Sequence, residues 1–529
     1  MSASLRELVL ARAADTRPGL VRSTTSPDGT TSVRSDTWAE VVHGSAVRAA
    51  ALRSLMDPSR PAHVGTLLGN TDEMLLAITA ASLGGHVCVG LNTTRRGAAL
   101  ATDTATADVQ VLLTDAAGVE LLGGVELPGV HLVRVDTPAW AALLEEHADA
   151  SLPSTPSDPD DLVMLIFTSG TSGRPKAVKV TDAKIAGPAA MLGERFGLGP
   201  DDVAYLSMPL FHSNAVMAGF GPALWGGATL AVAPFSASGF LGDVRRFGAT
   251  YANYVGKPLA YVLATPEQDD DAENPLRLLF GNEANERDIA EFGRRFGCMV
   301  VDSYSSTENA VIVRREPGMP AGALGRPAEG VAVLDPETLQ ETPDAVFDAD
   351  GRLANATEAT GEIVNTAGRG AFAGYYNDPA AEDERMRAGM YWSGDLAYRD
   401  ADGWIYFAGR TSDWLRVDGE NIAAAPVERV LLRHPDIGEA YVYAVPDPRS
   451  GDQVVAALVT TGPLDPAGFE AFLDAQADLS PKARPRFVLL DADLPRTATN
   501  KVLKRELTLR GSDAAAWERE ERGTAYRVR

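Results

Sequence analysis

Apolar residues recur along the first third of the chain in two alternating spacings. Helical spacing covers residues 37–56 and 74–83, whereas 63–68 and 87–91 are short continuous apolar runs. A further apolar run lies at 109–113. Short buried strands that alternate with helices are typical of a parallel sheet with helices on its faces. The pattern therefore predicts an α/β fold.

The alternation continues beyond a loop rich in Pro, Ser and Asp at 153–161. A strongly apolar strand is predicted at 162–167, and four more are predicted at 204–208, 229–232, 276–280 and 299–301. We expect these strands to extend the α/β part of the fold.

The pattern changes after about residue 330. Short strands with turn signals, such as 361–365 and 404–407, predict a small β-barrel-like part. A break at 409–413 precedes a strand at 439–445. We therefore predict a large N-terminal domain (1–410) of parallel-sheet α/β subdomains plus this β-rich part. A small, mobile α/β C-terminal domain (411–510) and a surface tail (511–529) should follow.

Composition limits the classes of function. The chain has 529 residues, 45% of them hydrophobic, so two or three domains are expected. A net charge of −24 argues against nucleic-acid binding. The N-terminus lacks a signal-peptide pattern, and no apolar run reaches the ~18 residues of a membrane span. We expect a cytoplasmic protein without stable membrane insertion, with Cys88 and Cys298 as buried thiols.

The sharpest chemical feature is the loop 168–176, Thr-Ser-Gly-Thr-Ser-Gly-Arg-Pro-Lys. Its glycines allow close backbone approach, so that successive N–H groups can surround an anion. Its hydroxyl groups add donors, and Lys176 adds a charge suited to phosphate. The loop lacks the Gly-Lys-Ser/Thr of a Walker A motif. A flexible surface loop is the alternative, but a buried strand delivers this one to a sheet edge where ligands bind.

Further motifs follow in a fixed order: 302–308 (Asp-Ser-Tyr-Ser-Ser-Thr-Glu), 391–395 (Tyr-Trp-Ser-Gly-Asp) with 409–410 (Gly-Arg), and 494–501 (Leu-Pro-Arg-Thr-Ala-Thr-Asn-Lys). With them the chain resembles the adenylate-forming superfamily over nearly its whole length. It is most similar to the branch of bacterial fatty-acid-CoA ligases and very-long-chain acyl-CoA synthetases. The stretches 208–214, 254–259 and 413–421 are also shared with that branch.

The resemblance implies a site for ATP and Mg²⁺. Tyr304 would stack on the purine, Thr307 would bond the α-phosphate, and Glu308 would hold the metal ion. Asp302 would lie near the adenine amino group. The ATP site would comprise Thr168, Ser169, Gly170, Thr171, Ser172, Lys176, Glu283, Asp302, Ser303, Tyr304, Asp395 (on the ribose) and Arg410. The catalytic residues would be Lys501, Thr307, Glu308 and His212, with Lys501 swinging in to meet the carboxylate and the α-phosphate.

Three positions depart from the family pattern. Ser305 and Asn309 replace glycines and are expected to narrow or polarise the acyl pocket, and Ser412 replaces the usual Asp or Lys at the domain hinge.

His212 would line and gate the acyl pocket; a core histidine is the alternative. The acyl site implied by the resemblance comprises His212, Asn214, Tyr254, Asn282, Ser305 and Asn309.

The predicted function is an ATP-dependent acid–CoA ligase. It would activate a fatty or aromatic acid as an acyl-adenylate and transfer the acyl group to coenzyme A. The alternative is a diazotase that activates nitrite and transfers it to an aminoaryl acid. A peptide-synthetase adenylation domain is disfavoured, because the amine-binding aspartate and a carrier domain are absent. Retention of Lys501, Asp395 and Glu308 disfavours a non-catalytic ATP-binding protein. A small-molecule acid is the expected partner, and a homodimer is allowed.

Overall fold

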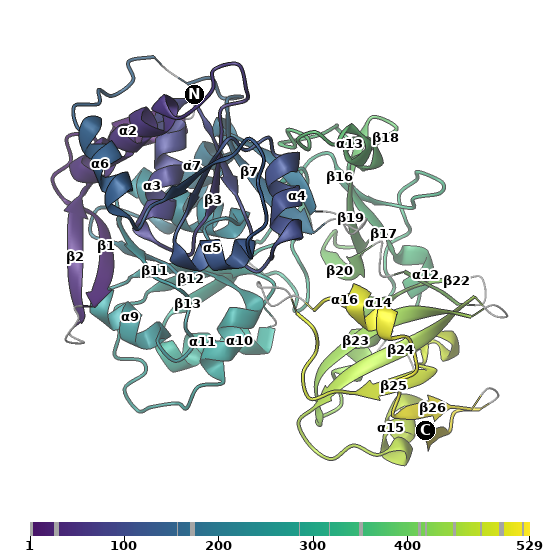
Figure 1. Ribbon diagram of the computed structural model, residues 1–529. Coiled ribbons are helices and arrows are strands. Elements are labelled where there is room, and N and C mark those ends of the chain that lie inside the picture. The colour runs from purple at the N-terminus through teal and green to yellow at the C-terminus, as the bar shows by residue number, and fades with distance from the viewer. Residues whose placement is uncertain are drawn as a thin grey trace. The chain divides into compact units, whose positions relative to one another are not determined.

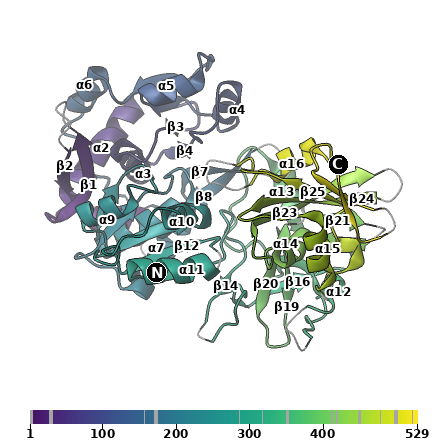
Figure 2. The ribbon, with the colours of Figure 1, turned by 90° about the horizontal axis from the view of Figure 1, so that it is seen from below.

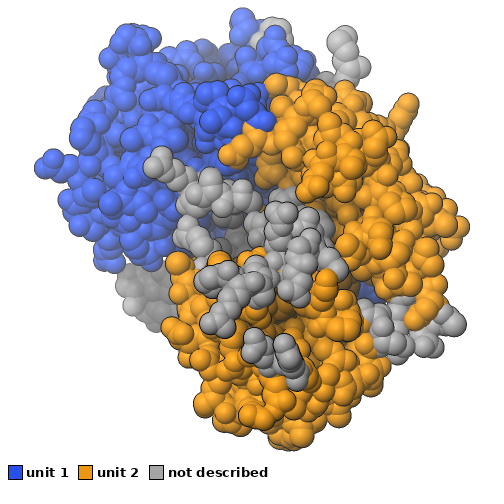
Figure 3. All heavy atoms as spheres, turned by 90° about the vertical axis from the view of Figure 1, so that its right-hand side faces the viewer, with its two compact units in different colours: residues 1–309, 371–383 blue, residues 310–370, 384–529 orange. Residues whose placement is uncertain are grey.

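The chain divides into two compact units, which are coloured separately in Figure 3. Unit 1 comprises residues 1–309 and 371–383, and unit 2 comprises 310–370 and 384–529. The predicted domain boundary at residue 410 falls within unit 2 and remains a prediction. The computed structural model describes every residue except 1–3, 26–30, 156, 170–174, 285, 317, 349–352, 411–413, 418–419, 448–450, 477–478, 497–501 and 521–522.

Two sheets form the framework of unit 1 (Figure 1). All neighbouring strands are parallel except for the pairs β1–β2 and β7–β8. The predicted parallel α/β architecture is thus confirmed. The first sheet has the order β13 (Met299–Asp302), β12 (Leu278–Asn282), β11 (Tyr251–Val255), β9 (Val203–Leu206), β10 (Thr229–Val232), β1 (Pro18–Thr25) and β2 (Thr31–Thr37). The second has the order β6 (His131–Arg134), β5 (Val111–Thr114), β3 (His63–Leu67), β4 (Val87–Gly90), β7 (Leu162–Ser169) and β8 (Pro175–Thr181).

Helices cover both faces of each sheet. The largest apolar core lies between the sheets and contains residues of α1 (Leu5–Leu10), α2 (Trp38–Ser54), α3 (Asp72–Gly84), α6 (Pro138–Glu146), α7 (Asp182–Phe196), α8 (Gly221–Gly226) and the π-helix η1 (Asn214–Phe220). The outer face of the seven-stranded sheet packs on α9 (Phe240–Phe247), α10 (Gly256–Leu263) and α11 (Glu286–Phe296), as Figure 2 also shows. The outer face of the six-stranded sheet packs on α4 (Ala98–Thr106) and α5 (Ala116–Leu122).

Local sequence explains why these elements form. Residues of β7 alternate between two cores: Met164 and Ile166 face the core between the sheets, whereas Leu165 and Phe167 belong to the outer one. At the start of α2, Thr37 and Glu40 form a capping box. The strand at 162–167 and the helix at 37–56 thus lie where the sequence predicted them.

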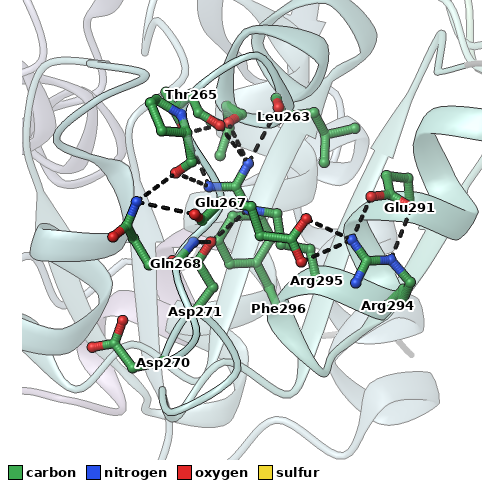
Figure 4. Close-up of polar contacts among 12 residues, drawn as sticks. Leu263, Thr265, Glu267, Gln268, Asp270, Asp271, Glu291, Arg294, Arg295 and Phe296 are labelled. Carbon is green, nitrogen blue, oxygen red and sulfur yellow. Dashed lines mark hydrogen bonds and ion pairs between the residues drawn. The ribbon is translucent and has the colours of Figure 1, made fainter.

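A buried ion pair fixes the connection between α10 and β12 (Figure 4). Arg295 of α11 donates from Nε to Asp271 Oδ2 at 2.6 Å, and both side chains are at most 5% exposed. Its Nη atoms donate to the carbonyl groups of Thr265 at 2.8 Å and Pro266 at 3.0 Å. The guanidinium therefore satisfies backbone acceptors that would otherwise be buried without a donor.

Unit 2 contains the predicted β-rich part and the predicted C-terminal α/β part. The β-rich part is a five-stranded antiparallel sheet made of β16 (Val331–Leu334), β17 (Gly361–Asn365), β18 (Met386–Arg387), β19 (Met390–Arg399) and β20 (Ile405–Arg410), beside the short pair β14 (Val313–Arg314) and β15 (Arg326–Pro327). The C-terminal part contains β21 (Trp414–Val417), β22 (Glu420–Ala423), β23 (Ile437–Asp447), β24 (Gly451–Thr460), β25 (Phe487–Leu490), β26 (Trp517–Arg519), β27 (Tyr526–Val528), α14 (Ala424–Leu431), α15 (Pro466–Asp474) and α16 (Lys504–Arg510).

The segment expected to be a surface tail, 511–529, instead completes this sheet. β26 pairs with β25, and β27 pairs with β26. Trp517 and Tyr526 are 4% and 7% exposed and pack against Phe469. The segment is polar overall, which led to the prediction of a surface tail. Its two aromatic residues nevertheless pack into the core of the C-terminal part.

Both cysteines are buried and free, as predicted. Burial raises the pKa of each thiol, Cys88 and Cys298, to about 12. Neither forms a reactive thiolate near neutral pH. Among the described helices, none combines the length and the apolar character needed to cross a membrane.

Candidate active site

Four parallel strands of the seven-stranded sheet end along the edge where the sequence places the predicted site. β11, β12 and β13 end at Val255, Asn282 and Asp302, and β9 ends at Leu206. The chain leaves β9 through 207–213 and enters η1. Because neighbouring strands are parallel, their carboxyl ends share one edge, which is where ligands bind in open α/β sheets.

Asp302 is held firmly at this edge. Its Oδ2 accepts hydrogen bonds from the Tyr254 hydroxyl at 2.8 Å and from the backbone N–H of Ala284 at 3.0 Å. Next to it, Ser303 donates from its backbone N–H and its hydroxyl to the Gly281 carbonyl at 2.8 and 3.1 Å. Tyr254, which the sequence assigned to the acyl site, is only 3% exposed and supports Asp302.

The loop that follows Asp302 brings two hydroxyl groups together. Thr307 Oγ1 lies 2.9 Å from Ser213 Oγ, although the residues are 94 positions apart. Thr307 is the residue expected to bond the α-phosphate, and Ser213 lies between the predicted acyl-site residues His212 and Asn214. The contact therefore joins the predicted phosphate and acyl parts of the site. Tyr304 is half-buried nearby in the same loop.

The backbone explains one departure from the family pattern. Asn309 has φ = 51°, in the left-handed region that glycine adopts without strain and asparagine tolerates better than most residues. Its backbone N–H donates to the Ser306 carbonyl at 3.1 Å. Ser305 is exposed. Asparagine at 309 thus preserves the turn that a glycine would make, and the expected narrowing of the acyl pocket remains a prediction.

Glu308, the predicted metal ligand, is 9% exposed and contacts a tyrosine that sequence reasoning did not select. The Tyr375 hydroxyl donates to Glu308 Oε1 at 2.8 Å. Lys176 Nζ lies 5.3 Å from the centroid of the same ring, within range of a cation–π interaction. Lys176 is 4% exposed, so it is not a solvated surface lysine. Tyr375 therefore links the lysine of the predicted phosphate loop to the predicted metal ligand.

A second lysine contributes to the same buried region. Lys184 of α7 is 4% exposed and donates from Nζ to the Lys179 carbonyl at 3.4 Å. Burial lowers the pKa of Lys184 to about 8, and the negative charge of Glu308 opposes this shift. Lys176 and Lys184 together give a positively charged spot, suited to phosphate, within a strongly acidic protein.

Residues 212–214 supply the predicted acyl side. The His212 ring is half-buried and lies 4.5 Å from the Phe211 ring. Asn214 begins η1 and donates from Nδ2 to the Tyr254 carbonyl at 3.1 Å and to Asn282 Oδ1 at 2.8 Å. Two residues assigned to the acyl site, Asn214 and Asn282, thus contact each other. Glu283, which follows Asn282, is exposed and has φ = 68°.

In unit 2, the structure brings Asp395 and Arg410 together. They are partners in the β19–β20 pair, and Arg410 Nε lies 3.4 Å from Asp395 Oδ1. The Asp395 side chain is 11% exposed and that of Arg410 is 47% exposed. Gly394, with φ = 76°, leaves room beside it for Arg385. Asp395 therefore lies within a strand and faces the arginine, rather than capping a turn.

Several predicted residues lie outside the described part of the chain. In the phosphate loop these are Gly170, Thr171 and Ser172, together with the side chain of Ser169. Ser412, at the predicted hinge, and Lys501 also lie outside it. Thr168 is paired with Lys176 across β7 and β8, so the two described ends of the loop are adjacent.

Sequence reasoning missed Tyr375, Lys184 and Asn253, a buried partner of Asn214. Nothing in the local sequence of Tyr375 or Lys184 distinguishes them from ordinary core or surface residues. Asn253 could have been found from the sequence, because its carboxamide interrupts the apolar strand Tyr-Ala-Asn-Tyr-Val at 251–255. A polar side chain in a buried strand needs a hydrogen-bond partner, so its presence predicts a buried polar contact at this position.

The arrangement can be compared with known proteins. A family model described as "AMP-binding enzyme" matches residues 11–376, and one described as "AMP-binding enzyme C-terminal domain" matches residues 426–501. The chain belongs to the AMP-binding enzyme family. The predicted membership of the adenylate-forming superfamily is thereby confirmed.

Relatives within the family are similar over most of the chain. A medium/long-chain-fatty-acid–CoA ligase, FadD17 of Mycobacterium marinum, is 53% identical over 480 residues, 90% of this chain and 92% of that protein. A steroid-22-oyl-CoA synthetase of Rhodococcus jostii is 50% identical over 479 residues, 89% of this chain and 86% of that protein. The chain is an adenylate-forming ligase of the acyl-CoA synthetase type. The comparisons lend no support to the diazotase alternative.

Solved structures agree on the fold. ATP-bound MatB of Rhodopseudomonas palustris has a TM-score of 0.80 and 23% identity, with 97% of this chain and 99% of that one covered. The predicted fold class is therefore confirmed.

The family implies ATP, and the residues around Glu308 suit a Mg²⁺–phosphate complex. Among the described residues, no group of three His, Cys, Asp or Glu side chains could form a metal site of its own. Mg²⁺ bound with nucleotides usually takes one or two carboxylates and completes its coordination with phosphate oxygens and water. A single anchored carboxylate beside two buried lysines fits that requirement.

Proposed function

We propose that this protein activates a carboxylic acid with a large apolar body, of the medium- to long-chain fatty-acid or steroid-side-chain kind, and transfers it to coenzyme A. The names of the relatives FadD17 and steroid-22-oyl-CoA synthetase support this substrate class. The observation that supports the proposal is the contact between Thr307, the residue predicted to bond the α-phosphate, and Ser213, in the segment expected to hold the acid.

In the proposed first half-reaction, a carboxylate oxygen of the acid attacks the α-phosphorus of ATP and pyrophosphate leaves. Lys176 and the loop 168–176 would hold the phosphates, and Thr307 would bond the α-phosphate. Glu308 would hold Mg²⁺, which neutralises charge on the phosphates when it is bound. Tyr304 would stack on adenine beside Asp302, and Asp395 would accept hydrogen bonds from the ribose hydroxyls.

In the second half-reaction, the thiol of coenzyme A attacks the acyl carbonyl, AMP leaves, and the thiol proton passes to solvent. Lys501 is proposed to act only in the first step, where it offsets negative charge as the carboxylate approaches phosphorus. We propose that Lys501 reaches the α-phosphate through a movement of the C-terminal domain, with the hinge near Ser412.

The test separates the two steps. Lys501→Ala should abolish acid-dependent exchange of pyrophosphate into ATP but leave thioester formation from a supplied acyl-adenylate largely intact. Lys504→Ala is the matched control, because Lys504 Nζ pairs with Glu428 Oε1 at 2.8 Å and has a structural role. The control should keep both activities. Exchange that survives in Lys501→Ala would refute the role of Lys501.

The substrate class is tested by giving the enzyme ATP, Mg²⁺ and coenzyme A with one acid at a time. The panel consists of butyrate, dodecanoate, palmitate, benzoate and a steroid side-chain acid. We expect kcat/KM to be highest for one of the large apolar acids, because each buried CH₂ contributes about 0.8 kcal/mol. A preference for benzoate or butyrate would refute the substrate class but not the ligase activity.

Two predictions complete the proposal. The first is a location in the cytoplasm. The second is a homodimer, which light scattering on the purified protein would detect.

A further inference from the structure

Three asparagine side chains form a continuous hydrogen-bonded chain from the core of unit 1 to the edge of the predicted site. Asn253, in the middle of β11, donates from Nδ2 to Asn214 Oδ1 at 2.7 Å. Asn214 donates from Nδ2 to Asn282 Oδ1 at 2.8 Å. Asn253 is 2% exposed, whereas Asn214 and Asn282 are half-buried. The carboxamides thus run from inside the core toward the carboxyl edge of the sheet.

The direction of each amide follows from a backbone carbonyl. Asn214 also faces the Tyr254 carbonyl at 3.1 Å. A carbonyl oxygen accepts hydrogen bonds and never donates, so the group of Asn214 that faces it must be the NH₂. Asn214 Oδ1 then points to Asn253, which must offer its own NH₂. By the same reasoning Asn282 turns its oxygen to Asn214, and its Nδ2 has no acceptor among the described residues.

The inner end of the chain is an unfavourable place for a carboxamide. Asn253 Oδ1 is buried and has no hydrogen-bond partner among the described residues. It is accommodated because residue 219 is glycine: a Cβ atom there would lie 2.7 Å from Asn253 Oδ1. An apolar side chain at 253 would remove this unpaired oxygen, but it would leave Asn214 Oδ1 without the donor it has now. Asn253 thus adds a second hold on Asn214, which the Tyr254 carbonyl orients from the other side.

The outer end of the chain lies beside the predicted reacting groups. Asn214 directly follows Ser213, whose hydroxyl contacts Thr307. Two residues after Asn282, the backbone N–H of Ala284 bonds Asp302. The NH₂ of Asn282, held between Ser213 and Ala284, would face an acceptor on the bound acid.

We propose that Asn253 is a positioning residue that acts through Asn214. Together with the Tyr254 carbonyl it holds Asn214, and through Asn214 it holds Asn282, so that the NH₂ of Asn282, and not its carbonyl oxygen, faces the carboxylate of the acid substrate. The proposal rests on the proposed function. It adds a specificity determinant for an anionic acceptor, because the opposite orientation of Asn282 would present an oxygen to the carboxylate and repel it.

The test uses Asn253→Leu, which keeps a side chain of similar size and removes the donor. Asn214 Oδ1 then loses the bond from Asn253, only the Tyr254 carbonyl still orients Asn214, and the NH₂ of Asn282 should be held less firmly toward the acid. With dodecanoate as the probe, we expect KM for the acid to rise about three- to tenfold, the scale of one neutral hydrogen bond, with KM for ATP nearly unchanged. Asn282→Gly should raise the same KM without touching the core.

The double variant decides between orientation and general damage. Once Asn282→Gly has removed the outer amide, adding Asn253→Leu should raise KM for dodecanoate by less than twofold, because Asn282 no longer offers an NH₂ for Asn253 to hold in place. Asn274→Leu is the control. Asn274 donates to the Asp271 and Phe296 carbonyls, so this variant should lower stability but leave KM unchanged.

The possible failures are distinguishable. Equal KM values for dodecanoate in wild type and Asn253→Leu, or fully multiplicative effects in the double variant, would overturn the positioning role. No acid-dependent pyrophosphate exchange in the wild type, with any acid, would instead refute the proposed function. If Asn253→Leu does not fold, Asn214→Asp provides the second comparison, because it replaces the donor that faces Asn282 with an acceptor.

Discussion

The hydroxyl of Tyr375 offers a direct test of how Glu308 is used. Tyr375→Phe removes the donor that lies 2.8 Å from Glu308 Oε1 and keeps the ring against which Lys176 lies. The cation–π contact should therefore survive, and any effect should come through the carboxylate.

Two magnitudes follow from the geometry. Tyr375 and Glu308 are 2% and 9% exposed, so the bond is buried and its acceptor is charged. Losing such a bond should lower the free energy of unfolding by about 1.5–3 kcal/mol. The released carboxylate must also be immobilised again when it binds the metal ion, at a cost of about 0.5–1.5 kcal/mol. The Mg²⁺ concentration for half-maximal ATP binding should accordingly rise about two- to tenfold.

The assay is calorimetric titration of ATP, without acid, over a range of Mg²⁺ concentrations, paired with urea unfolding. Tyr376→Phe is the matched control, because the Tyr376 hydroxyl donates to Asp108 Oδ2 at 2.9 Å, which is also a bond from a tyrosine to a carboxylate but involves no predicted metal ligand. The control should lose stability and keep its Mg²⁺ dependence. The reasoning is refuted if Tyr375→Phe is destabilised but binds ATP with the Mg²⁺ dependence of the wild type.

Three further predictions concern stability. Asn309→Ala should lower the free energy of unfolding by about 1 kcal/mol because alanine is strained at φ = 51°, whereas Asn309→Gly should not, as urea unfolding would show. Burial lowers the pKa of His86 to about 4. As the pH falls from 7.5 to 5, His86 therefore takes up a proton in the unfolded state but not in the folded state, and the free energy of unfolding should fall by about 2 kcal/mol. His86→Gln should lose that part of the pH dependence in denaturation measured at both pH values. Arg295→Met leaves the Asp271 carboxylate buried without its ion-pair partner and should cost about 3–5 kcal/mol. The further change Asp271→Leu should recover only part of this loss in thermal unfolding, because the Thr265 and Pro266 carbonyls still lack the donors that Arg295 supplied.

Local pattern was a good guide to the elements of the fold. The strands predicted at 63–68, 87–91 and 162–167 are present, because a buried strand of a parallel sheet is apolar along its whole length. The same reasoning failed for 511–529, where Trp517 and Tyr526 are isolated aromatic residues in a polar segment. Their burial depends on Phe469, which lies far away in the sequence, so no local pattern marks it.

The sequence by itself determined the family, the parallel α/β framework and the order of the motifs, since these depend on local spacing and on residue types read along the chain. The tertiary structure alone decided which side chains hold the predicted site in place. Tyr375 reaches Glu308 across 67 positions, and Asn253 reaches Asn214 across 39. Such pairs form where separate strands and loops converge at one sheet edge, and the partner of a buried hydroxyl or carboxamide is set by that convergence rather than by its neighbours in sequence.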